Sequence, residues 1–214
     1  MSEKNTKGDI QDAESLFREN LEKSFGDIDP SARDLALEQS MPEQGSRLFS
    51  VFAGEFKEFF GSNMKIFSIE EELYESVQDA DGNDIGLKFK GFIDMVLKDS
   101  QGNYHIIDWK TCSWGWDAKK KSDPMNTYQL VYYKQYFSKK HSIPLQNIEV
   151  YFGLLKRTAK KNLVEIFKVT SGPRRVSNAS VFLEKVVHNI SNKNFIKNRL
   201  SCSRCEYYNT EHCN

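Results

Sequence analysis

The fold is decided by two apolar stretches, GFIDMV at residues 91–96 and HIIDWKT at residues 105–111. Their apolar composition predicts a strand for each, and turn-forming residues at 99–103 separate them. Side chains of a strand alternate between its two faces, so Asp108 and Lys110 point the same way, and Asp94 joins them if the two strands pair. Two carboxylates and an amine on one face can hold a divalent metal ion beside a phosphate.

Asp94, Asp108 and Lys110 resemble the Asp…(Asp/Glu)-x-Lys pattern of the PD-(D/E)XK nucleases, and their setting is most similar to the RecB-type branch. The resemblance implies an α/β fold with a restriction-endonuclease-like core, in which helices flank a mixed central β-sheet. It also implies that Asp94, Asp108 and the carbonyl of Trp109 hold Mg²⁺ or Mn²⁺. Lys110 then orients the attacking water or stabilises the oxyanion.

Composition and charge exclude several classes of protein. The 214 residues suffice for one full domain with a sizeable core, and 39% hydrophobic with 28% charged residues is ordinary for a globular protein. Lys plus Arg and Asp plus Glu are both 30, so the net charge of zero gives no global attraction to nucleic acid. No apolar run has the length of a membrane span and no signal peptide is recognisable, so we expect a cytoplasmic protein that does not contact a membrane.

The domain division expected from the sequence is an N-terminal helical extension at residues 1–41, a nuclease domain at 42–196 and a cysteine-rich tail at 197–214. Residues 1–8 look disordered, and residues 9–25 have helical spacing. Other expected helices are at 42–60, 128–139 and 177–195, with further strands at 65–74, 148–155 and 163–169. We expect a turn at 79–84 and a basic hairpin turn at 157–162.

The helix expected at residues 42–60 matters for metal binding. In RecB-type nucleases the corresponding helix often begins with a Gly and carries a His that helps to bind metal. Gly45-Ser46-Arg47-Leu48-Phe49 resembles that start, but Phe49 stands where the His would be. Glu55 on the same helix is a candidate substitute ligand, although a solvated surface glutamate is the simpler interpretation. One of the glutamates at 70–72 in the first strand is another candidate to face the metal.

The loop at residues 112–126 leaves the predicted catalytic strand directly. Aromatic side chains can stack on unpaired bases, and lysines can follow phosphates. The alternative is a packed pair of tryptophans beside a solvated run of lysines. The candidate DNA-binding residues are Trp114, Trp116, Lys119, Lys120 and Lys121.

The helix that follows carries Gln129 and Tyr133, four residues apart and therefore on one face. This Gln-x-x-x-Tyr pair resembles the fourth motif of RecB-type nucleases, which orients the site and contacts DNA. Each motif alone is short, but the order Asp, Asp-x-Lys, Gln-x-x-x-Tyr is specific.

Three of the four cysteines crowd at the C-terminus, as Cys202, Cys205 and Cys213. Cys-x-x-Cys with a third Cys soon after is typical of a metal site. It also resembles the tail of iron–sulfur RecB-type nucleases such as AddB and the CRISPR-adaptation nucleases, in which a 4Fe–4S cluster takes its fourth Cys from before the nuclease core. Here the remaining Cys is Cys112, and His212 offers an alternative fourth ligand for Zn²⁺; unmetallated cysteines are the third interpretation.

The resemblance therefore implies a Mg²⁺- or Mn²⁺-dependent deoxyribonuclease, an exonuclease of RecB type. Its expected partners are DNA that is single-stranded or has free ends, and recombination or replication proteins. Two alternatives stay open at this stage. One is a catalytically inactive nuclease fold that binds DNA, and the other is an iron–sulfur or zinc protein whose strand carboxylates are structural.

Overall fold

The computed structural model describes residues 3–78, 83–194 and 199–213. The chain forms two compact units, residues 1–176 and residues 177–214. The boundary between these units, after residue 176, differs from the boundaries that the sequence predicts, which lie after residues 41 and 196. The domain division expected from the sequence stays a prediction. The turn expected at 79–84 lies mostly outside the described residues.

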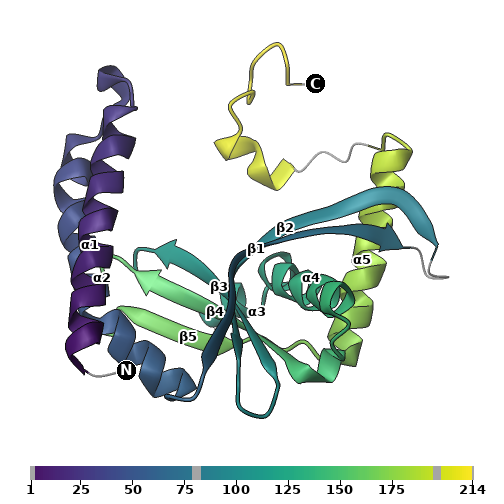
Figure 1. Cartoon of the computed structure of the whole chain (residues 1–214). Coiled ribbons are helices and arrows are strands. Elements are labelled where there is room, and N and C mark those ends of the chain that lie inside the picture. The colour runs from purple at the N-terminus through teal and green to yellow at the C-terminus, as the bar shows by residue number, and fades with distance from the viewer. Residues whose placement is uncertain (1–2, 79–82, 195–198, 214) are drawn as a thin grey trace. The chain divides into compact units, whose positions relative to one another are not determined.

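The first unit contains a mixed β-sheet in the order β1-β2-β3-β4-β5 (Figure 1). Only β3 and β4 are parallel, because the segment between them includes a crossover helix, while the other neighbours are antiparallel. The predicted α/β class and mixed central sheet are confirmed. The strands are β1 Lys65–Gln78, β2 Asp84–Lys98, β3 Tyr104–Cys112, β4 Ile148–Lys156 and β5 Val164–Lys168.

The β1–β2 hairpin is longer than the rest of the sheet. β2 pairs with β1 from Lys98 back to Asp84, but it pairs with β3 only from Lys98 to Met95. Beyond Met95 the hairpin continues without β3, as Figure 1 shows. β2 therefore separates from β3 at Asp94.

Helices cover both faces of the sheet. On one face Trp109 packs against Phe52 and Phe56 of α2 (Leu35–Phe60), with ring centroids 5.1 and 6.5 Å apart. Trp109 also lies over Gly153 of β4, where a Cβ would collide with the indole ring. The other face is covered by α4 (Pro124–His141), whose buried side chains include Leu130, Val131 and Phe137.

The N-terminal helices differ from the expectation. The prediction of disorder at residues 1–8 is wrong for Glu3–Gly8, because α1 spans Glu3–Gly26. α2 begins at Leu35 rather than near Pro42, because the Asp34 carboxylate caps it by accepting a hydrogen bond from the backbone N–H of Leu37. Pro42 therefore lies inside the helix. In Figure 1 α1 and α2 run side by side, and Phe17 packs against buried Gly45.

The remaining helices are short or lie toward the C-terminus. α5 begins at Pro173, four residues before the predicted start, and ends at Ser191. No helix in the described ranges is long and apolar enough to cross a membrane. The other elements are α3 Ala118–Ser122 and the 3-10 helices Pro30–Ala32, Leu145–Asn147 and Arg199–Arg204.

Candidate active site

Asp94 lies where β2 leaves β3. The last Cα pair between the strands is Met95 with Ile107, so the antiparallel register would next place Asp94 opposite Asp108. Instead of continuing the main-chain ladder, Asp94 Oδ2 accepts a hydrogen bond of 2.6 Å from the backbone N–H of Trp109. This bond satisfies the donor that strand separation exposes, and it fixes the Asp94 carboxylate against β3.

Asp108 is almost completely buried, with 2% of its surface exposed. Its Oδ1 accepts a hydrogen bond of 3.0 Å from Gln129 Nε2, and its Oδ2 lies 2.7 Å from Lys110 Nζ. That ion pair lacks ordinary hydrogen-bond geometry, so Oδ2 accepts no hydrogen bond within the described structure. The pKa of Asp108 is raised to about 6. Burial is the main cause and the negative charge of Asp94 adds to it, while Lys110 acts in the opposite direction.

Lys110 pairs with the buried Asp108 carboxylate and is itself partly exposed to solvent. Its side chain is 35% exposed, although its ammonium group contacts Asp108. The contact confirms that Asp108 and Lys110 share a face of β3, as the strand alternation predicts. Lys110 can therefore reach a bound phosphate while its amine stays near the acidic pair.

Gln129 and Tyr133 meet Asp108 from α4. Gln129 Nε2 donates to Asp108 and also, at 3.0 Å, to the hydroxyl of Tyr133. The Tyr133 ring lies over Gly91 of β2, where a Cβ would be 2.8 Å from the ring, so a larger side chain at 91 would displace it. Burial is the main reason that the pKa of Tyr133 is raised above its ordinary value. The residues predicted from the Gln-x-x-x-Tyr pattern thus lie beside Asp108.

The acidic pair offers oxygen ligands that suit a hard cation. Asp108 has a buried oxygen without a hydrogen-bond donor, and the Trp109 carbonyl belongs to the same strand segment. Among the described residues, no three or more His, Cys, Asp and Glu side chains gather as a metal site. Glu55 lines a separate hollow beside β5 with Lys156 and Glu165.

The glutamates at 70–72 lie on β1, and Glu71 is buried. It pairs with Lys140 at 3.0 Å and with His141, both at the end of α4. Hydrogen bonds from Ser68, His141 and Lys140 outweigh the burial that would raise the pKa of Glu71, and they lower it. Glu71 therefore has structural partners of its own.

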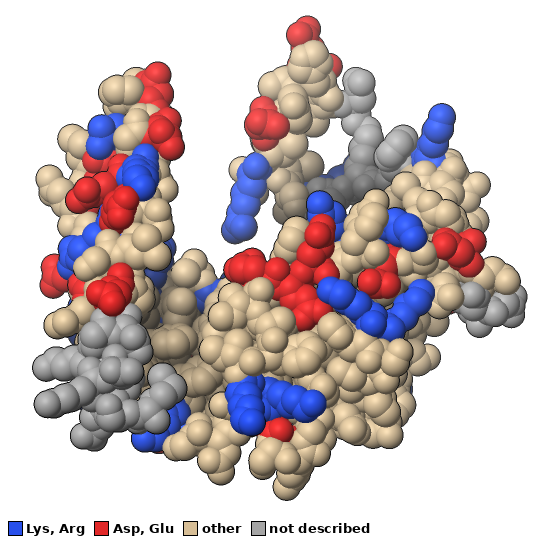
Figure 2. Space-filling view, viewed as in Figure 1, with Lys and Arg blue, Asp and Glu red and all other residues tan. Residues whose placement is uncertain are grey.

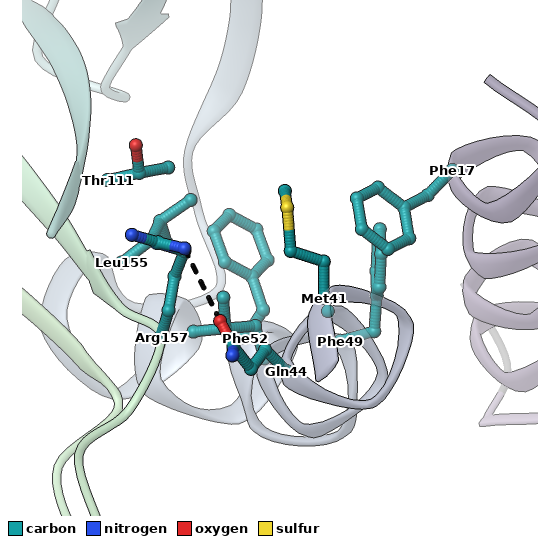
Figure 3. A pocket seen from close by; sticks show the side chains of 10 residues that line it. Phe17, Met41, Gln44, Phe49, Phe52, Thr111, Leu155 and Arg157 are labelled. Atoms are coloured by element: carbon teal, nitrogen blue, oxygen red, sulfur yellow. Dashed lines mark hydrogen bonds between the residues drawn. The ribbon is translucent and has the colours of Figure 1, made fainter. Parts of the chain in front are cut away.

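Phe49, at the position where the resemblance would place a His, lines an apolar pocket of about 370 Å³ (Figure 3). Its ring centroid lies 5.6 Å from that of Phe17 on α1. Thr111 and Leu155 close the pocket from the sheet, and Arg157 reaches Gln44 at its polar end. Phe49 thus packs α2 against its neighbours.

The loop after β3 has two tryptophans in different environments. Trp114 is 72% exposed, whereas Trp116 packs on Phe152 with ring centroids 5.0 Å apart. Lys120 Nζ lies 4.7 Å from the centre of the Trp116 ring, and Lys121 pairs with Glu165. The segment expected to be irregular contains α3 and the start of α4. The packed arrangement therefore holds for Trp116 but not for Trp114, and the DNA-binding interpretation of this loop stays a prediction.

The cysteines fall in both units. Cys112 ends β3, while Cys202, Cys205 and Cys213 belong to residues 177–214. All four are free thiols, and the backbone N–H of Cys205 donates to the Cys202 carbonyl at 3.1 Å. No metal-binding group that includes these cysteines or His212 is formed among the described residues.

Sequence reasoning missed the glycines that shape the site and the pairing of Lys156 with Glu165. Gly91 admits Tyr133, and Gly153 admits Trp109. A glycine inside a strand is a known sign of close approach by another group, so both could have been found. The ion pair between Lys156 and Glu165, at 3.2 Å, depends on strand register and left no local signal.

No curated protein matches this chain. A solved structure described as "Crystal structure of SSO0001" is 16% identical and covers 89% of this chain and 77% of its own, with a TM-score of 0.42. The family model described as PD-(D/E)XK nuclease superfamily matches residues 2–210. Because this match covers nearly the whole chain, the protein belongs to the PD-(D/E)XK nuclease superfamily.

Proposed function

We propose that this protein is a metal-dependent deoxyribonuclease of RecB type that works as an exonuclease on DNA. Membership of the nuclease superfamily supports hydrolysis of phosphodiester bonds. The observation that carries the proposal is the grouping of Asp94, Asp108 and Lys110 where β2 separates from β3. The contact of Gln129 with Asp108 supports the RecB-type assignment.

Asp94, Asp108 and the carbonyl of Trp109 would hold Mg²⁺ or Mn²⁺, which lowers the pKa of a water molecule and neutralises charge on the scissile phosphate. The chain supplies the oxygen ligands that these ions prefer. Burial raises the pKa of Asp108 to about 6, so protons compete with a cation for this carboxylate as the pH falls toward 6. Asp94 is held in place by the N–H of Trp109.

Lys110 is the electrostatic group of the site. Its amine lies against Asp108 and is partly exposed, so it can turn toward a phosphate oxygen. There it would orient the attacking water or stabilise negative charge that develops on the phosphate. Because the same amine pairs with Asp108 Oδ2, it would have to turn from that oxygen toward the phosphate when a metal ion binds.

Gln129 and Tyr133 act as positioning residues. The Gln129 amide holds one oxygen of Asp108 and leaves the other directed toward Lys110. Tyr133 in turn accepts from Gln129 and is seated against Gly91. This chain of contacts from α4 fixes the buried carboxylate before any substrate arrives.

A second proposal concerns the tail, where Cys202, Cys205 and Cys213 are proposed to bind a 4Fe–4S cluster or Zn²⁺. The Cys-x-x-Cys spacing supports it. Among the described residues, no group of three or more His, Cys, Asp and Glu side chains forms a metal site. No step of the proposed chemistry involves this centre. Recombination or replication proteins are proposed as further partners on resemblance alone.

One gel assay tests the nuclease proposal. Single- and double-stranded DNA, labelled at the 5′ or 3′ end, is incubated with Mg²⁺, Mn²⁺ or EDTA. We expect cleavage with either metal and none with EDTA, and release of short products from one end. DNA binding without cleavage in every metal would instead favour the inactive nuclease fold that the Phe49 departure allows.

A further inference from the structure

The loop after the catalytic strand is tied to the turn between β4 and β5. The backbone N–H of Arg157 donates to the Cys112 carbonyl at 2.8 Å. The Ser113 carbonyl accepts from the backbone N–H of Thr158 at 3.1 Å and from its hydroxyl at 2.9 Å. These bonds join two segments that lie far apart in the sequence, and they place the basic turn at 157–162 beside residues 113–117.

The same loop is also fixed from its other side. Gly115 has a φ of +115°, which favours glycine, and a Cβ there would lie 3.0 Å from the aliphatic part of Lys156. Trp116 is packed on the sheet, and Asp117 caps α3 by accepting from the backbone N–H of Lys120 at 2.7 Å. Trp114 is therefore held between anchored neighbours although its own side chain is 72% exposed.

Exposed lysines lie on both segments beside Trp114. Lys119, Lys120, Lys160 and Lys161 are exposed, and none of them forms an ion pair within the described ranges of the chain, although Lys120 also lies over the Trp116 ring. The nearby Glu165 is already neutralised by Lys121 and Lys156. By contrast, Figure 2 shows acidic and basic side chains close together over the β1–β2 hairpin, where Lys90 and Glu72 lie 3.8 Å apart.

We propose that Trp114, with the lysines of α3 and of the β4–β5 turn, forms a binding surface for unpaired bases of a single-stranded DNA segment that leads into the active site. An exposed indole on a rigid loop offers a stacking face to a base at little entropic cost, and the lysines fit the phosphates on either side. Trp114 follows Lys110 by four residues, at most about 14 Å of chain, so the bases concerned are close to the scissile phosphate.

This inference deepens the proposed function and rests on it, since it assigns single-stranded DNA to the same site. It also separates the residues that the sequence grouped together. Trp116 and Lys121 hold the loop on the sheet, and Lys120 lies over the Trp116 ring, while Trp114 and Lys119 are the exposed side chains that would face the substrate. Lys160 and Lys161 join them from a turn that the sequence had marked only as basic.

The test measures binding separately from cleavage. A fluorescein-labelled oligothymidine and a blunt duplex of equal length are titrated in EDTA, with fluorescence anisotropy as the readout. We expect Trp114→Ala to weaken binding of the single strand by roughly 5- to 100-fold, and Trp114→Phe to keep most of the affinity. Because Trp109 and Trp116 are packed, quenching of intrinsic fluorescence by the oligomer should vanish in Trp114→Phe.

The lysines are tested with a matched control. Lys160→Ala with Lys161→Ala should lower the slope of log affinity against log salt by roughly 0.7 for each phosphate that the protein no longer neutralises. Lys57→Ala with Lys65→Ala also removes two exposed lysines, but these lie outside the loop and the turn, and the slope should stay unchanged.

Unchanged oligothymidine affinity in folded Trp114→Ala would overturn the inference, as would an equal loss for the blunt duplex. The proposed function fails in a different way. If the wild-type protein cleaves no DNA with Mg²⁺ or Mn²⁺ while Trp114-dependent binding persists, the binding surface stands and the catalytic proposal falls.

Discussion

Asp94 Oδ2 accepts a 2.6 Å hydrogen bond from the backbone N–H of Trp109, at the point where β2 and β3 stop pairing. A side chain thus replaces the main-chain acceptor that a continued ladder would supply. The same bond holds the Asp94 carboxylate against β3, next to the buried Asp108. The metal site proposed here depends on this local end of the sheet.

Asp108→Asn should stabilise the protein at high pH in EDTA. The pKa of Asp108 is about 6 in the fold and about 4 when unfolded, so folding favours the protonated acid. Stability is therefore lost as pH rises from about 4 to about 6, by roughly 2–3 kcal/mol, and the loss persists above that range. Gln129 can rotate its amide to accept from the new Asn.

Thermal melts at pH 4, 6 and 8 check this prediction. The variant should melt several degrees higher than the wild type at pH 8, and the difference should shrink toward pH 4. A variant that melts at or below the wild-type temperature at pH 8 would show that ionised Asp108 is not a destabilising group.

Asp94→Asn and Asp108→Asn should each weaken Mn²⁺ binding, because both remove charge from one ion site. Isothermal titration calorimetry gives the affinity directly. Glu55→Gln is the matched control, since Glu55 lines a hollow beside β5, and its Mn²⁺ affinity should equal that of the wild type. Unchanged affinity in both aspartate variants would place the metal elsewhere.

Gln129→Ala should lower kcat by roughly 10- to 100-fold with little change in KM, because a hydrogen bond to a charged group is worth roughly 1.5–3 kcal/mol. Tyr133→Phe should have a smaller effect, since it keeps the contact between Gln129 and Asp108. Steady-state kinetics on one labelled DNA compares them. A Tyr133→Phe loss that equals or exceeds the Gln129→Ala loss would contradict this order.

Protein purified without oxygen should be brown if Cys202, Cys205 and Cys213 bind an iron–sulfur cluster, and colourless with stoichiometric zinc if they bind Zn²⁺. Cys202→Ser should release the metal and lower the melting temperature. Metal analysis that finds neither iron nor zinc would remove the tail centre.

Sequence patterns predicted the parts of the site that depend on local periodicity. Alternation along β3 put Asp108 and Lys110 on one face, and helical spacing put Gln129 and Tyr133 on another single face; the structure bears out both. The chain order of the motifs also indicated the superfamily that the family model matches. These relationships need only the geometry of one strand or one helix.

Relationships that depend on tertiary packing were not predictable in the same way. Trp114 and Trp116 are equivalent in sequence terms, but only Trp116 meets Phe152 and Phe167 of the sheet. The bond between Thr158 and Ser113 requires the parallel register of β3 and β4. The early start of α2 is different, because Asp34 is of a residue type that caps helices and could have indicated this start from the sequence.

Cleavage by the Lys110→Ala variant tests the central claim most directly. End-labelled single-stranded DNA is incubated with Mg²⁺ in single-turnover conditions, beside the wild type and a Lys65→Ala control whose lysine is exposed outside the site. We expect Lys110→Ala to cleave roughly 10²- to 10³-fold more slowly, while its fold and its DNA affinity in EDTA stay close to wild type. Cleavage by Lys110→Ala at the rate of the Lys65→Ala control would contradict the account.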